Sequence, residues 1–280
     1  QVTSPNTCVR EQAMHSLQVL AKVSNKSVTE VMIPHKEVLA DMIPPKKHLL
    51  RHQPVNAQIG LMDGNTFCTT LEPRLFTIDI TINEHKLFFT ELFGLCDNED
   101  QNLFKLPCYK NVTNLTPIKK SALRALAACH YITVCKDKIF AVLYKALNSM
   151  NPELQETGYQ CMKSFIAHAH LEQETIHAQI RPLLLLLGDF RALNLNVIQR
   201  LSYLTQLFPN IFNEKLCEQM ATHLKHWLEA AIRASRKGEK NLDEMKLCAA
   251  IINLFHQVRT NFNSHLNKQR KTLNALMFLK

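Results

Sequence analysis

Residues 116–148 read TPIKKSALRALAACHYITVCKDKIFAVLYKALN and predict two consecutive amphipathic helices. Thr116 and Pro117 form a helix start signal, because a proline at the first helical position needs no partner for its missing N–H. Apolar residues then recur three and four positions apart, which is the period of one helix face. The first stripe is Leu123, Leu126 and Ala127, ending near His130, and the second is Ile139, Val142, Leu143, Ala146 and Leu147. The segment therefore predicts one helical hairpin.

The same pattern returns three more times along the chain. Asn151, Pro152 and Glu153 form the next start signal, with an acid in the first turn to meet the positive end of the helix dipole. First helices begin near residues 117, 152, 191 and 241, at spacings of about 35, 39 and 50 residues. The later stripes are Leu154, Gly158, Cys161 and Phe165; Val197, Ile198, Leu201, Leu204 and Phe208; Leu216, Met220, Leu224 and Leu228; and Leu247, Ile251, Leu254 and Val258. Two-helix units of about 40 to 47 residues are typical of HEAT-type solenoids.

We therefore predict an all-α, HEAT-like helical-repeat superhelix, an ARM-type solenoid, with an ordinary helical bundle as the alternative. Pro182 should remove one hydrogen bond from its helix and bend the axis. The five leucines at 183–187 also fit a buried strand, since periodicity does not separate the two structures. Gly158 would allow a neighbouring helix to approach closely.

Three regions are expected. Residues 1–114 form less regular helical repeats, with an extended segment near 72–83 where Phe76, Ile78, Ile80 and Ile82 alternate with polar residues. Residues 115–258 form about four HEAT-like hairpins. Residues 259–280 form a basic tail, with five basic residues and no acidic one, which departs from the repeat pattern.

This departure has a consequence for stability. Each hairpin of a solenoid leaves an apolar face for the next one to cover. A foreign tail would cover the face of Leu247, Ile251 and Leu254 poorly, so amides beyond Asn241 should exchange faster than those of residues 116–228.

Composition excludes several classes of protein. With 46% apolar residues and 6 glycines in 280, the chain is neither disordered nor collagen-like. Its formal charge of +9 is dispersed, so direct nucleic-acid binding is not expected. No apolar run is long enough to span a bilayer and no secretory leader is present, while a first residue other than Met indicates a fragment. The 9 cysteines lack CxxC pairs and read as free thiols of a reducing compartment, with Cys129, Cys161 and Cys248 buried and unreactive.

The histidines and cysteines of the sequence do not form the pattern of a metal site or a catalytic site. His168 and His170 lie on diverging helix directions, whereas His223 and His226 share a face near Cys217 but lack further ligands for zinc. Cys129 with His130, and Cys96, are weak nucleophile candidates, because a thiolate is disfavoured on an apolar face. Trp227 fits helix packing better than a ligand site. No hydrolase, nucleotide-binding or kinase motif is present, so we predict no catalytic, cofactor or metal residue, and no partner-binding residue is singled out.

Specific runs resemble a known family. They are Glu72–Phe76 (EPRLF), Glu84–Lys86 with Thr90–Leu92, Lys105–Lys110 (KLPCYK), Ala122–Tyr131 (ALRALAACHY), Lys145–Ser149, Arg181–Leu183, Leu207–Asn210 with Phe212–Cys217, and Glu244–Cys248 with Ile251–His256. Over about residues 55–258, the chain is similar to the transformation/transcription domain-associated proteins. The resemblance implies a segment of the HEAT-repeat arm of a giant pseudokinase related to the phosphatidylinositol-3-kinase-like kinases.

The resemblance also implies a function. Members of this family are scaffolds of SAGA-type and MYST-type histone acetyltransferase complexes that receive transcriptional activators. We therefore predict a nuclear, non-catalytic coactivator segment that binds acetyltransferase complex subunits and activators, with no cofactor and no membrane. Alternatives are a karyopherin-like transport receptor and a nucleic-acid-binding helical array.

Overall fold

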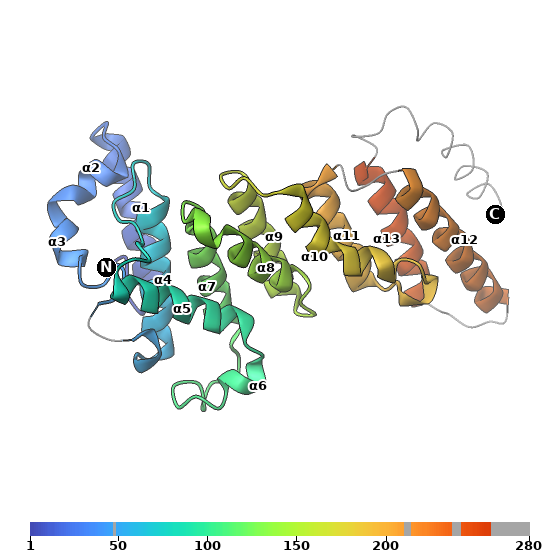
Figure 1. Ribbon diagram of the computed structural model, residues 1–280, viewed down its shortest axis with the longest axis horizontal. Coiled ribbons are helices and arrows are strands. Elements are labelled where there is room, and N and C mark those ends of the chain that lie inside the picture. The colour runs from blue at the N-terminus through green and yellow to red at the C-terminus, as the bar shows by residue number, and fades with distance from the viewer. Residues whose placement is uncertain (47–48, 210–213, 237–241, 259–280) are drawn as a thin grey trace. The chain divides into compact units, whose positions relative to one another are not determined.

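The computed structural model describes residues 1–46, 49–209, 214–236 and 242–258. Within these ranges the chain is helical, the one β contact is an isolated bridge between Met42 and Pro45, and no helix is long and apolar enough to cross a membrane. The chain divides into two compact units, Gln1–Glu172 and Gln173–Lys280. Figure 1 shows the helices of each unit.

Unit 1 begins with helices that the sequence predicts only in part. The first helices are α1 (Thr7–Val23), α2 (Val28–Met32), α3 (Lys36–Leu39) and α4 (Val55–Thr70), with the short 3-10 helices η1 (Ile33–His35) and η2 (Leu50–His52) between them. Residues 27–43, with Pro34 near their middle, form three short helical pieces, α2, η1 and α3. Asn6 and Ser27 cap α1 and α2 through side-chain oxygens.

Helix α4 was not predicted from the sequence. Its buried positions include the polar residues Gln58, Asn65 and Thr69 and two glycines, so no apolar stripe marks it. Residues 2–4 lie directly on it, because a Cβ at Gly60 would lie 2.5 Å from the Ser4 carbonyl oxygen. The glycines of α4 therefore provide the close approach of two backbones.

The 71–82 segment is an irregular connection between helices, as expected. The Ile78 N–H donates to the Tyr131 hydroxyl at 2.8 Å, which ties this segment to the end of the next hairpin. Helix α5 (Asn83–Asp97) and the one-turn α6 (Asp100–Leu103) follow this segment. Two lysines hold the connection between them, since Lys119 Nζ donates to Asn98 O at 3.0 Å and Lys145 Nζ contacts Asp97 Oδ1 at 3.0 Å.

Helices α7 (Thr116–Ala128), α8 (Lys136–Leu147) and α9 (Pro152–Ile166) confirm the predicted helices of this stretch, with η3 (Thr133–Cys135) before α8. They pack on one another, and α7 also packs on α4 and α5 (Figure 1). Asn151 caps α9 by accepting from the N–H groups of Glu153 and Leu154. The predicted close approach at Gly158 is confirmed, because a Cβ there would lie 2.8 Å from the Leu147 backbone nitrogen.

Unit 2 contains α10 (Gln173–Leu186), η4 (Phe190–Ala192), α11 (Leu195–Leu207), α12 (Glu214–Arg236) and α13 (Leu242–Val258). The first four of the five leucines lie in α10, so the strand alternative is wrong. Pro182 lies inside this helix, as predicted.

The apolar stripe predicted for the last helix lies in α13. Leu247, Ile251 and Leu254 are buried, and α13 packs on α11 and α12. Their face therefore lies towards α11 and α12, and the expectation that the tail covers it poorly stays a prediction. Residues 259–280 lie outside the described residues. The division at residue 115 into irregular and regular repeats stays a prediction.

Candidate functional site

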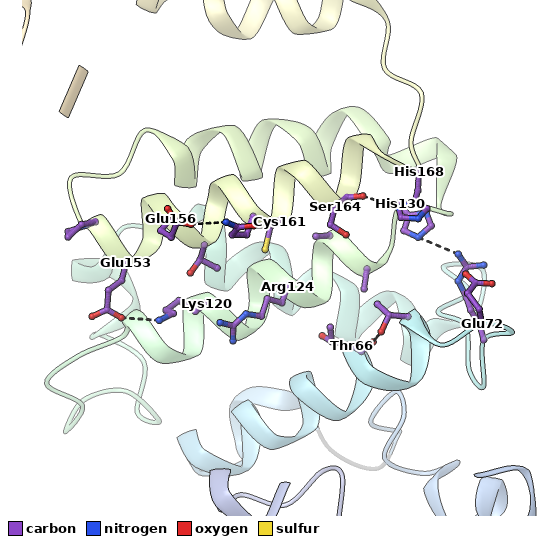
Figure 2. A pocket seen from close by; sticks show the side chains of 17 residues that line it. Thr66, Glu72, Lys120, Arg124, His130, Glu153, Glu156, Cys161, Ser164 and His168 are labelled. Carbon is purple, nitrogen blue, oxygen red and sulfur yellow. Dashed lines mark hydrogen bonds and ion pairs between the residues drawn. The ribbon is translucent and has the colours of Figure 1, made fainter. Parts of the chain in front are cut away.

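An open groove of about 840 Å³ lies in unit 1 between α4, α7, α9 and the start of the 71–82 segment. Its floor is made of small or apolar side chains of α7 and α9, among them Ala127, Ala128 and Cys161. Charged and polar side chains form the rims. Figure 2 shows Lys120 and Glu153 at one end, with Glu72, His130 and His168 at the other.

Helix packing sets the position of the α9 rim. Gly158 lets α9 lie against α8, and Asn151 fixes where α9 begins through its cap and through a 3.0 Å hydrogen bond from Nδ2 to Thr116 Oγ1. Exposed positions four apart, Gln160 and Ser164, then line the groove on one helix face. The groove is thus a consequence of two start signals that the sequence shows.

The charged groups on the rims differ in how they are neutralised. Lys120 Nζ pairs with Glu153 Oε2 at 2.9 Å, and Glu156 Oε1 accepts from Gln160 Nε2 at 2.8 Å. Arg124, one helical turn beyond Lys120, has no hydrogen bond or ion pair within the described part of the chain. Its exposed guanidinium keeps five donors for a ligand.

The opposite end is an aromatic and cationic corner, which we define as Arg74, Tyr131, His130 and His168. The guanidinium of Arg74 lies 4.7 Å from the centre of the Tyr131 ring, and its NH2 is 3.3 Å from His130 Nε2. The rings of His130 and His168 stack with centroids 4.6 Å apart. No carboxylate of the described residues lies within ion-pair distance of Arg74.

Burial and neighbouring charges shift the pKa values of two residues of this corner. Burial lowers the pKa of His130, the neighbouring His168 and Arg74 lower it further, and Glu72 opposes them. Burial also raises the pKa of the Tyr131 hydroxyl. The corner therefore combines the positive charge of Arg74 with the opposing charge of Glu72, and no ion pair neutralises Arg74 among the described residues.

The hydrogen bonds define which ring nitrogens carry protons. Arginine has no acceptor, so His130 Nε2 accepts from Arg74 and Nδ1 carries the proton. His168 Nδ1 lies 2.9 Å from the Ser164 carbonyl oxygen, which only accepts, so this nitrogen donates and Nε2 stays available.

The predicted histidine pairs are separated or used in packing. His168 lines the groove while His170 does not. His223 is buried with Nε2 2.6 Å from the Leu187 carbonyl oxygen, and His226 stacks on Phe190. No cluster of three metal-ligating side chains occurs in the part of the chain that the structure describes. Trp227 donates from Nε1 to Phe190 O at 3.3 Å, in agreement with a packing role.

The cysteine candidates are buried thiols. Burial raises the pKa of Cys129 and of Cys161 to about 12 and also raises those of Cys96 and Cys248. The Cys129 Sγ donates to Ala125 O at 3.3 Å, within its own helix turn. The neighbouring His130 instead joins the groove, a role that the sequence reasoning missed.

Comparison with known proteins gives the family. Residues 1–271 match the model of the Tra1 HEAT repeat ring region, which includes residues 259–271 of the predicted tail. The chain is 58% identical over 266 residues to the transformation/transcription domain-associated protein of Danio rerio and 56% identical over 277 residues to that of Homo sapiens, matching 92% of the chain in each case. It is also 27% identical over 284 residues, 95% of the chain, to the SAGA complex/NuA4 acetyltransferase complex subunit TRA1 of Saccharomyces cerevisiae. The chain spans 7% of the length of each of these three relatives. The chain therefore belongs to the Tra1 family, within its HEAT repeat ring region.

Proposed function

We propose that this chain is a non-catalytic scaffold segment of a nuclear transcription coactivator, which recruits histone acetyltransferase complexes to activators through protein–protein contacts. The family supports the coactivator role, since relatives are named as transcription-associated proteins and as subunits of the SAGA and NuA4 acetyltransferase complexes. None of the relatives described above is named as a transport receptor.

The groove of unit 1 is the surface that we propose for this contact. It is open, its floor is apolar and its rims carry charged side chains, which is the composition of a surface that binds a polypeptide segment. It is built on three packed helices, so its shape is fixed before a partner arrives. The single observation that carries the proposal is this preformed groove in a family of complex subunits.

Blocking the groove tests the proposal. Ser164→Trp adds a large ring to an exposed position that faces the groove, whereas Lys163→Trp adds it to an exposed position of the same helix that does not line it. The affinity-tagged protein, expressed from its own gene, is purified from nuclear extract and its partners are quantified by mass spectrometry. We expect acetyltransferase subunits with the unmodified protein and a selective loss of one or more partners with Ser164→Trp.

The control variant, Lys163→Trp, must retain all the partners of the unmodified protein. Identical partner lists for Ser164→Trp and the unmodified protein, in material with equal thermal stability, would remove the groove as a docking surface. Absence of acetyltransferase subunits from every preparation would contradict the scaffold role itself.

A further inference from the structure

We propose that the Arg74–Tyr131–His130–His168 corner receives a phosphorylated serine or threonine side chain of the partner segment that occupies the groove. The proposal rests on the proposed function, because it names the chemistry of the partner. It is carried by the arrangement of donors at the corner and by the Arg74 guanidinium, which has no ion-pair partner among the described residues.

The donors at the corner match a phosphate group. Arg74 brings a guanidinium, His130 brings the N–H of Nδ1, and His168 presents Nε2, which becomes a donor when the ring takes up a proton. A phosphate monoester offers three strong acceptor oxygens and nearly two negative charges near neutral pH. Clusters of arginine and other donors are a recurring means of phosphopeptide recognition.

The corner is held in place before a ligand arrives. Arg74 packs on the Tyr131 ring at 4.7 Å, and the Tyr131 hydroxyl accepts from the Ile78 N–H at 2.8 Å, so the arginine side chain has a fixed support. The His130 ring stacks on His168 at 4.6 Å, whose Nδ1 is tied to the Ser164 carbonyl oxygen. The two imidazoles thus stay adjacent, and a phosphate at the corner would meet both of them beside the Arg74 guanidinium.

Three carboxylates line the groove, and one of them, Glu72, lies at the corner (Figure 2). Glu72 is the acidic residue that acts on His130, and it opposes the effect of two cationic neighbours. Glu153 and Glu156 are engaged by Lys120 and Gln160. Arg124 lines the same groove unpaired, so an anionic segment that extends from the corner meets a second cation.

The histidines at 168 and 170 provide a matched pair for the test. Both are exposed, but only His168 lines the groove. Binding of a fluorescein-labelled twelve-residue peptide, with one phosphoserine among leucine and alanine residues, is measured by anisotropy with the full 280-residue chain at pH 6.5 and pH 8. The same peptide is also made with serine and with glutamate at the central position.

We expect the phosphoserine peptide to bind about tenfold more tightly than the serine peptide, and His168→Gln to remove most of that difference while His170→Gln changes it less than about twofold. Binding to the unmodified chain should be tighter at pH 6.5 than at pH 8, because acid favours the imidazolium form of a histidine, which donates from both nitrogens, and His168→Gln should reduce that pH dependence. Equal affinity for the phosphoserine and glutamate peptides would overturn the phosphate assignment. Equal loss with His168→Gln and His170→Gln would overturn the assignment to this corner.

A second measurement separates this inference from the proposed function. Nuclear extract is treated with phosphatase before the tagged protein is added. If Ser164→Trp removes partners that phosphatase treatment leaves bound, the groove remains a docking surface and the phosphate inference falls. If phosphatase removes the same partners as Ser164→Trp, both proposals are supported.

Discussion

His85 shows how one buried imidazole contributes a pH dependence. Its Nδ1 accepts a hydrogen bond from the Asp79 N–H at 3.0 Å, which requires that this nitrogen be unprotonated. Burial and then Lys46 lower the pKa of His85, against the opposite effects of Asp79 and Glu84. The folded chain therefore binds fewer protons than the unfolded chain once the pH falls below about 6.5, so folding stability declines from there towards the lower, folded-state pKa.

We predict that His85→Gln reduces the loss of stability between pH 7 and pH 5, since glutamine keeps an acceptor without a titrating ring. Urea unfolding at a series of pH values, followed by circular dichroism, measures the effect. His15→Gln, at an exposed position of α1, is the control and should keep the pH dependence of the unmodified chain. A parallel pH profile for His85→Gln would contradict the prediction.

The cysteines should differ widely in reactivity. With pKa values raised to about 12, Cys129 and Cys161 would be ionised in only about one molecule in ten thousand at pH 8, and both are buried. Cys8 is exposed. We predict that a thiol reagent at pH 8 labels Cys8 within minutes while Cys129, Cys161 and Cys248 react only after denaturation, as peptide mapping would show. Comparable native rates at Cys8 and Cys161 would mean that α9 is packed in another register.

At the scale of elements, the contact of α9 with α8 depends on a missing side chain. A Cβ at Gly158 would lie 2.8 Å from the Leu147 nitrogen and 3.0 Å from the carbonyl carbon of Ala146, neither of which can move without displacing α8. We predict that Gly158→Ala lowers the free energy of unfolding by about 1–3 kcal/mol.

The matched control is Gly94→Ala in α5, where the nearest atom to a Cβ is 3.8 Å away. Alanine should be accommodated there and stabilise the helix by about 0.5–1 kcal/mol. Urea unfolding measures the free energy of unfolding of both variants. A loss of equal size at the two positions would show that the contact between α8 and α9 is not the cause.

At the scale of a whole unit, the packing of α13 indicates that this last described helix is as stable as the rest of unit 2. Ile251 is fully buried and Leu254 nearly so, and α13 contacts both α11 and α12. The structure thus predicts that amides of α13 exchange as slowly as those of α11, in contrast to the faster exchange that the repeat pattern predicts beyond Asn241.

A substitution in α13 tests whether this helix is part of the core of unit 2. Ile251→Ala should destabilise unit 2 by about 2–5 kcal/mol and speed exchange in α11 and α12 together with α13. Met245→Ala, at a position that is 64% exposed on the same helix, should change stability by less than about 0.5 kcal/mol. Fast exchange in α13 of the unmodified chain would favour the expectation from the sequence.

Sequence and tertiary structure determined different parts of this protein. The amphipathic stripes and start signals at 116–117 and 151–153 were sufficient to place α7, α8 and α9, because local hydrogen bonds and one-sided burial leave a periodic trace in the residues. They were not sufficient for α4, because polar residues and glycines occupy most of its buried positions and leave no apolar period. The corner of the groove was decided by tertiary structure alone, since Arg74 and His130 are 56 residues apart and meet only when the 71–82 segment docks against the end of α7.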